Sequence, residues 1–323
     1  MLNNKFSHDK YGDDLLLITM SGIMELSRRM RRIKPSIDDE LRGWNWHQPP
    51  LLHAYPSVNL PISDIYSEVC RCGALVHIKH NLKACPKLPY SVSGTIAHNL
   101  WIRFHTHLQR LAAIATSPMD LAQQLLHAAE EEKQNLIAKL SNAESPTSLQ
   151  EKIDEWIKAL WYPMIHLATA EYIKLLTSPA GLPHETIISW LCPMVLELKI
   201  DGSLLGFSSN CRLDGLAPLG LVLEIKTGRP NPIHELALTA YALAIESYFE
   251  IPIDYGMILY LSLQPDRPVC TSYIRLVTID EKLRLDALEE RDRMCKIVAD
   301  GEFKNPTKPC GPLCPLTSVT TIV

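Results

Sequence analysis

The sequence predicts an α/β (α+β) fold in which a mixed sheet is flanked by helices. Between residues 94 and 178 the apolar residues recur with the period of a helix, and from 194 to 278 the period falls to that of strands. In the second region a strand, a helix and another strand follow one another. This order implies a parallel strand pair with a right-handed connection.

The individual elements follow from these periods and from the breaker residues between them. Helices are expected at 11–34, 94–115, 119–142, 149–177, 232–249 and 281–299, and strands at 195–201, 203–208, 210–215, 220–226, 255–262 and 270–278. Pro118 separates two of the helices, and Pro232 suits the first turn of another. Residues 35–62 are rich in Pro and Trp and should wrap the surface of the domain.

The order of elements divides the chain into four parts. The N-terminal helix, the irregular wrap and a first cysteine half-site occupy 1–93, and a helical insert that carries a histidine motif occupies 94–193. The sheet and its helices form the core at 194–300, and a second cysteine half-site occupies 301–323.

Composition excludes several classes of protein. Hydrophobic residues make up 46% of the 323 residues, which excludes a disordered chain. No apolar run approaches the roughly 18 residues of a membrane span, and the polar start lacks a signal-peptide pattern. We therefore expect a cytoplasmic protein without a membrane partner.

The net charge of −4 does not indicate a strongly basic nucleic-acid binder. One short run is nevertheless basic, and it contains Arg28, Arg29, Arg31, Arg32 and Lys34. Cations suit the C-terminal end of a helix, and they also suit phosphate contacts, so the sequence leaves both interpretations open.

Asp214 and the triplet Glu224-Ile225-Lys226 carry the strongest chemical signal. Residues two apart share a face of a strand, so Glu224 and Lys226 project together while Ile225 points into the core. A short turn at 216–220 would place Asp214 beside them. Two carboxylates and one ammonium group suit a hard divalent cation and phosphodiester hydrolysis, although charged residues on strands also occur without such a role.

Two further residues are candidates for the same site. His98 lies near the start of a predicted helix, and Tyr241 lies on the helix that follows the triplet. A helical histidine that points inward is often a core residue, and His105 shares its face. For Tyr241, core packing and a contact with Lys226 or DNA both stay open.

The nine cysteines form a second signal, because an odd number excludes complete internal pairing. Those in or beside apolar runs should be packing residues: Cys192, Cys211 and Cys270. Cys70-x-Cys72 and Cys310-x3-Cys314-Pro315 are two half-sites of a four-thiolate centre, with Cys295 or Cys85 as alternatives for the fourth ligand. An iron–sulfur cluster, a zinc ion and free thiols all stay open.

Taken together, the motifs resemble the RecB-like branch of the PD-(D/E)XK nucleases. The resemblance rests on Gly94-x3-His98, Asp214-Gly215, Glu224-Ile225-Lys226-Thr227-Gly228 and the helix that carries Tyr241. The flanking cysteines resemble those of the iron–sulfur nucleases of that branch. More narrowly, residues 40–46, 67–70, 201–208 and 241–247 resemble the CRISPR-associated exonuclease family Cas-four, in its archaeal Csa-one branch.

The resemblance implies a restriction-endonuclease-like sheet with a helical insert and a cysteine-bound cluster lobe. It implies that Asp214, Glu224, the Ile225 carbonyl and His98 hold Mg²⁺ or Mn²⁺, and that Lys226 and Tyr241 complete the catalytic set. A [4Fe-4S] cluster on Cys70, Cys72, Cys310 and Cys314 is implied in the same way, with Zn²⁺ as the runner-up.

The implied function is a metal-dependent DNA exonuclease that trims DNA ends, single-stranded ends above all, for CRISPR spacer acquisition in antiviral defence. The implied partner is the integrase complex of Cas-one and Cas-two. The alternatives are a general RecB-type repair nuclease and a subunit that holds DNA ends without cutting them. Polarity of digestion, sequence preference and formation of a homo-oligomer stay open.

Overall fold

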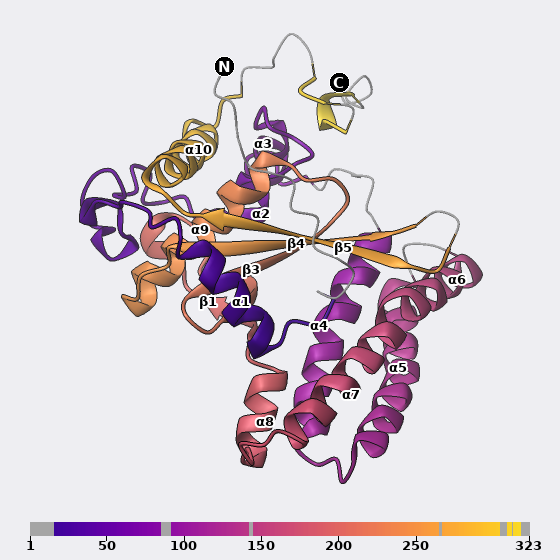
Figure 1. Ribbon diagram of the computed structural model, residues 1–323. Coiled ribbons are helices and arrows are strands. Elements are labelled where there is room, and N and C mark those ends of the chain that lie inside the picture. Colours follow the sequence, from indigo (N-terminus) through magenta and orange to yellow (C-terminus); the bar gives the residue numbers. More distant parts are fainter. Residues whose placement is uncertain are drawn as a thin grey trace.

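A five-stranded mixed sheet lies at the centre of the molecule, with helices on both faces (Figure 1). The computed structural model describes residues 16–84, 92–141, 145–264, 267–303, 309–311 and 313–317. The strands, in their order across the sheet, are β1 (Val195–Ile200), β2 (Cys211–Ala217), β3 (Leu221–Thr227), β4 (Tyr255–Leu263) and β5 (Cys270–Thr278). Only β3 and β4 are parallel. The predicted mixed sheet flanked by helices is confirmed.

The parallel pair is connected by α9 (Pro232–Phe249), as the strand–helix–strand order predicts. Asn231 caps this helix by accepting the backbone N–H of Ile233, and Pro232 fills the first turn, where a missing N–H costs nothing. With α10 (Glu281–Asp300), which is capped by Asp280, α9 packs on one face of the sheet. The apolar core on this side includes Val222, Ile258 and Leu243.

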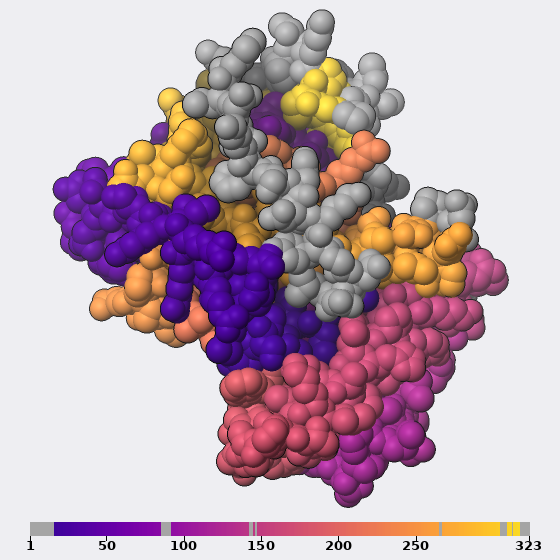
Figure 2. Space-filling model, in the orientation of Figure 1, coloured from indigo at the N-terminus to yellow at the C-terminus, as the bar shows by residue number. Residues whose placement is uncertain are grey.

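The opposite face is covered by α4 (Val92–Ala112), on which the other helices of the insert pack. These are α5 (Pro118–Leu140), α6 (Pro146–Trp156), a π-helical segment η4 (Ile157–Trp161), α7 (Tyr162–Leu176) and α8 (His184–Leu191). They project away from the sheet as a separate lobe, coloured magenta to rose in Figures 1 and 2. The predicted helix 149–177 is therefore one run interrupted by a π-helical turn, and α8 was not predicted.

The N-terminal part wraps the outside of the core, as the Pro- and Trp-rich composition predicts. Its elements are α1 (Met20–Met30), η2 (Asp39–Leu41), η3 (Gly43–Asn45), α2 (Ile62–Ile65) and α3 (Ala74–His80). Buried Glu246 on α9 anchors the wrap, because it accepts hydrogen bonds from the backbone N–H of Gly43 and from the guanidinium groups of Arg42 and Arg284.

One predicted strand is wrong, and one predicted helix is shorter than expected within the described residues. Residues 203–208 form a turn instead of a strand: η5 (Ser203–Leu205) begins where Asp201 accepts the Ser203 N–H, and Gly206 closes it with a φ of 76°. The helix predicted at 11–34 begins only at Met20, because Thr19 caps it, and residues 1–15 lie outside the described chain.

Candidate functional site

His98 and Asp214 meet at the face of the sheet that α4 covers. His98 lies in the second turn of α4, and its Nε2 is 2.8 Å from Oδ1 of Asp214 on β2. Burial acts to lower the pKa of His98, but the hydrogen bond and charge of Asp214 outweigh it and hold this pKa above its ordinary value. A helix of the insert is thus joined to the sheet by an acid–base pair that solvent still reaches on the His98 side, whose side chain is 32% exposed.

Asp214 is held in place by a fork between β2 and β3. Their ladder ends at the pair Gly215–Leu223, while β3 continues to pair with β4 and β2 with β1. The N–H of Ile225, which faces the fork, donates instead to Oδ2 of Asp214 at 2.7 Å. Because a buried N–H requires an acceptor, this carboxylate replaces the missing strand.

Glu224 and Lys226 form the second pair of the site, on the face of β3 that α9 covers. The Lys226 ammonium donates to Oε1 of Glu224, which is only 6% exposed. The other oxygen, Oε2, is buried and has no hydrogen-bond partner among the described residues. Burial, together with the charge of Asp214, raises the pKa of Glu224. An unpartnered buried carboxylate oxygen is costly, and a cation at that oxygen would offset the cost.

The charges around Lys226 keep it protonated. Burial acts to lower its pKa, but Glu224 and then Asp214 and Glu68 outweigh burial, so the pKa is raised. Tyr241 on α9 packs against the apolar core of the same face, and burial followed by the charges of Glu224 and Asp214 holds the pKa of its hydroxyl far above the ordinary value. Tyr241 therefore faces the acidic pair as a neutral phenol.

The structure also contains a chain of hydrogen bonds beside Lys226 that the sequence did not reveal. His234 on α9 lies 3.0 Å from Oε2 of Glu68 through Nε2 and 3.0 Å from the Tyr260 hydroxyl through Nδ1. In the β3–β4 ladder, Tyr260 is the residue paired with Lys226. The one signal in the sequence was that Glu68 lies two residues before Cys70, the first residue of the first cysteine half-site.

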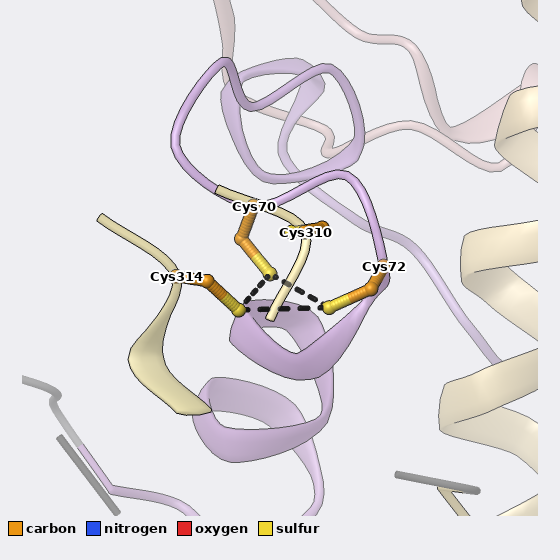
Figure 3. Close-up of side chains that lie close together, drawn as sticks. All are labelled: Cys70, Cys72, Cys310 and Cys314. Atoms are coloured by element: carbon orange, nitrogen blue, oxygen red, sulfur yellow. Dashed lines mark hydrogen bonds between the residues drawn. The ribbon is translucent and has the colours of Figure 1, made fainter. Parts of the chain in front are cut away.

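The four predicted cysteines come together at one centre (Figure 3). The sulfur of Cys70 lies 3.5 Å from that of Cys72 and 4.0 Å from that of Cys314, and Cys72 and Cys314 are 3.7 Å apart. Cys310 joins them, since all four sulfurs lie within 4.8 Å of one another. Cys70 and Cys314 are buried, and Cys310 is exposed. Two half-sites about 240 residues apart thus form a four-thiol group.

The ionisation of these thiols depends on whether a cation is bound. Burial raises the pKa values of Cys70 and Cys72. Burial would also raise that of Cys310, but hydrogen bonds from the Cys72 N–H and from neighbouring thiols lower it to about 7. Four thiolates can coexist at this distance only if a cation compensates their charge.

The spacing of the sulfurs bears on the kind of metal. A tetrahedral zinc ion with Zn–S bonds of about 2.3 Å places its sulfurs about 3.8 Å apart, close to the observed separations. A four-iron cluster binds each thiolate to a different iron and so needs wider spacing. The donor set fits both, but a cluster requires the sulfurs, those of Cys70 and Cys72 included, to move apart.

Among the described residues, no other cysteine belongs to this centre. Cys295 is buried in the core between α9 and α10, and Cys211 packs at the start of β2, where its thiol donates to the Ser208 carbonyl. Cys85 lies outside the described residues. The fourth member of the group is therefore Cys70.

Among the described residues, the four cysteines are the one set of three or more His, Cys, Asp and Glu side chains gathered closely enough to hold a metal ion. His98, Asp214 and Glu224 are less tightly grouped, because Asp214 is engaged by His98 and Ile225, and Glu224 by Lys226. A shared cation would require one of these carboxylates to rotate away from its present partner.

Comparison with known proteins decides the family. The family model described as CRISPR-associated exonuclease Csa1 matches residues 16–321. This chain belongs to that family. It is similar to the CRISPR-associated exonuclease Csa1 of Saccharolobus solfataricus, at 28% identity over 91% of this chain and 96% of the relative. The protein of the same name from Thermoproteus tenax is 26% identical over 93% of this chain and 99% of its own length. The expected resemblance is confirmed.

One solved structure, described as "Crystal structure of SSO0001", aligns with 49% of this chain and 69% of its own at 16% identity, and its TM-score of 0.21 is too low to compare folds. The names of the Csa1 relatives support a CRISPR-linked exonuclease. Among the described residues, none of the helices combines the length and apolar character that a membrane span needs.

Proposed function

We propose that this protein is a metal-dependent DNA exonuclease that trims DNA ends, single-stranded ends above all, for the acquisition of CRISPR spacers. Membership of the Csa1 family supports the exonuclease class. The observation that carries the proposal for the site is that two acid–base pairs, one on each face of the sheet, lie at the fork, and that Oε2 of Glu224 is buried beside a protonated lysine without a partner among the described residues.

The donors at the fork suit a divalent cation. Asp214 and Glu224 would hold it through carboxylate oxygens and His98 through Nε2, with the Ile225 carbonyl as a further oxygen, and an imidazole among oxygens suits Mn²⁺ as well as Mg²⁺. When bound, the cation supplies Lewis-acid polarisation of a phosphate and a more acidic water.

The other groups at the fork would act on the phosphodiester directly. Lys226 carries a fixed positive charge that offsets the charge developing on the phosphate oxygens. Tyr241 remains a neutral donor toward the same place. The insert helix α4, which brings His98, would form one wall over the DNA end.

Site-directed variants test the assignment. Asp214→Ala and Glu224→Ala should abolish cleavage of single-stranded DNA with Mg²⁺ or Mn²⁺ and leave DNA binding intact, because each removes a cation ligand and not a phosphate anchor. Lys226→Ala should lose turnover and keep metal binding. Glu185→Ala, an exposed residue of α8, is the matched control. Full cleavage by Asp214→Ala would contradict the proposal.

We further propose that Cys70, Cys72, Cys310 and Cys314 hold a structural metal centre, an iron–sulfur cluster by resemblance or a single zinc ion by spacing. Anaerobic purification followed by visible absorption and by iron and zinc analysis separates the two. Cys314→Ser should lose metal and thermal stability, whereas Cys211→Ser should keep the metal. A wild-type protein that contains neither metal would exclude the centre.

The proposed partner of the trimmed DNA is the integrase complex of Cas-one and Cas-two. Binding of the protein to that complex should depend on DNA with a free end. If Glu224→Ala still holds DNA ends within the complex and spacer acquisition persists, the protein acts as an end-holding subunit and not as the nuclease.

A further inference from the structure

The hydrogen-bonded chain beside Lys226 connects the two sites of this molecule. It starts at Glu68, passes through His234 and ends at the Tyr260 hydroxyl, with both contacts at 3.0 Å. His234 is 3% exposed, so its ring is fixed at both nitrogens inside the core. Tyr260 lies next to Lys226 across the parallel ladder, and adjacent residues of paired strands place their side chains on the same face.

The other end of this hydrogen-bonded chain, Glu68, lies close in sequence to the four-cysteine centre. Glu68 precedes Cys70 by two residues, in a segment that forms no helix or strand. This segment is held by the sulfur of Cys70, which accepts the Leu75 N–H at 3.4 Å, and by Arg293, which donates to the Arg71 carbonyl at 2.7 Å. The Glu68 side chain is 53% exposed, so little besides His234 fixes its position.

A buried histidine is often no more than a satisfied core residue. Here, however, one of its two partners comes from the segment that the cysteines anchor, 166 residues away in sequence, and the other lies beside Lys226. A core histidine could have used a backbone carbonyl of its own helix, as His105 does with Trp101 on α4. Through this arrangement, residues 67–72, which carry Cys70 and Cys72, are linked to the surroundings of Lys226.

Resting on the proposed nuclease function, we propose that Glu68 is a positioning residue: through His234 and Tyr260 it couples the metal-loaded state of the four-cysteine centre to the placement of Lys226. When the centre is loaded, the segment 67–72 is fixed, and the Glu68 carboxylate holds His234 against Tyr260. When the centre is empty, the segment moves, and the chain beside Lys226 loses its anchor.

The test compares the full-length, metal-loaded protein and its Glu68→Ala and Glu68→Gln variants with Cys314→Ser, which should lack the metal. Glu68→Ala should keep the wild-type iron or zinc content and lower kcat by about tenfold to a hundredfold with KM unchanged, the range typical of residues that orient a catalytic group. Glu68→Gln should recover most of kcat, because its amide oxygen still accepts from His234. Glu131→Ala is the matched control, because this glutamate on α5 is 52% exposed and also contacts a histidine, His127, but does not touch the segment 67–72.

Amide hydrogen exchange supplies a readout independent of activity. Both Glu68→Ala and Cys314→Ser should increase exchange in the first turns of α9, and the double variant should exchange no faster than Cys314→Ser alone. If the effects of Glu68→Ala and Cys314→Ser on kcat or on exchange multiplied in the double variant, the coupling would be overturned. Loss of metal from Glu68→Ala, or an unchanged kcat in that variant, would also overturn it. Activity of Asp214→Ala would instead contradict the nuclease assignment itself. Failure of the coupling and failure of the proposed function are therefore distinguishable.

Discussion

Glu197 on β1 lies across from Asp214 on β2, between the pairs Leu196–Gly215 and Leu198–Leu213, and its backbone has a positive φ of 49°. The ladder is interrupted at this point. On one side of the interruption Leu213 packs in the core under α9, and on the other side Ala217 packs in the core under α4. The kink at Glu197 thus lets β1 and β2 pass from one layer to the other, and it leaves Asp214 at the crossing.

The backbone of Glu197 predicts a measurable strain. A left-handed conformation is unfavourable for residues with a Cβ, so Glu197→Gly should be more stable than Glu197→Ala by about 0.5 to 1 kcal/mol. Both variants lose the exposed ion pair with Arg212, which contributes little and cancels in the comparison. Urea unfolding in EDTA measures the difference. Equal stability of the two variants would show that the position is unstrained.

The pair of His98 and Asp214 predicts a pH-dependent contribution to stability. Because the pKa of His98 is raised in the folded state, its contribution is complete below the ordinary value of 6.5 and disappears as the pH rises through the higher folded pKa. In EDTA, His98→Ala should therefore cost about 1 to 2 kcal/mol near pH 6 and less near pH 9.

His105, on the same helix, provides the contrast. Burial lowers its pKa to about 4, so the wild-type protein should lose stability through this group as the pH falls from 6.5 toward 4. His105→Gln should remove that acid sensitivity. The effects of His98→Ala and His105→Gln on the free energy of unfolding should therefore change with pH in opposite directions. The same pH dependence for both variants would contradict the opposite pKa shifts of the two rings.

Gly43 predicts a severe packing defect. A Cβ at this position would lie 2.2 Å from the Leu243 carbonyl and 2.8 Å from the Ser247 nitrogen, both backbone atoms of α9. Gly43→Ala should therefore cost about 3 kcal/mol by forcing the wrap away from the helix. Gly22→Ala, in α1, meets nothing nearer than 3.9 Å and should stabilise by about 0.5 to 1 kcal/mol. Thermal unfolding of both variants checks the contrast.

Much of this arrangement could be predicted from local patterns. The alternation in Leu223-Glu224-Ile225-Lys226 places charge on one face of a strand, and strand β3 does carry the Glu224–Lys226 pair there. The two half-sites of cysteines were likewise identifiable, because short cysteine spacings beside turn-formers have few other uses. These features depend on neighbouring residues, which a sequence displays directly.

What the sequence did not show depends on distant partners. The strand predicted at 203–208 has the alternation of a strand, but the Asp201 side chain and Gly206 fold it into a turn, and Phe207 makes only one bridge, to Leu60. The contact between Glu68 and His234 joins residues 166 positions apart in the sequence, and neither their residue types nor their spacing predicts it. Helix α8 is short, and its apolar residues were not distinguished from the connection around them.

The last prediction concerns the basic run at the end of α1. Arg28 and Arg29 are paired with Glu25 on the same helix, while Arg31 and Arg32 lie exposed just beyond its last turn. The Tyr255 hydroxyl donates to the Ile33 carbonyl, which places the run at the start of β4. Tyr255 pairs with Leu221, whereas Tyr260 pairs with Lys226. At about 3.3 Å per residue, the run therefore lies roughly 16 Å along the sheet from the proposed nuclease site at Lys226.

Because of this distance, DNA binding by the basic run and DNA cleavage at the fork can be tested separately. A stacked strand rises about 3.4 Å per nucleotide, so a DNA end in the site would reach the run only after about five nucleotides. Replacing Arg28, Arg29, Arg31 and Arg32 by glutamate should leave kcat/KM on a shorter oligonucleotide unchanged. On long single strands the same variant should bind more weakly and with a shallower dependence on salt, since fewer counterions are released. Equal affinity for short and long strands in both proteins would show that the arginines serve only to end the helix. Reduced cleavage of the short oligonucleotide would place the run at the catalytic fork, against the register of β3 and β4.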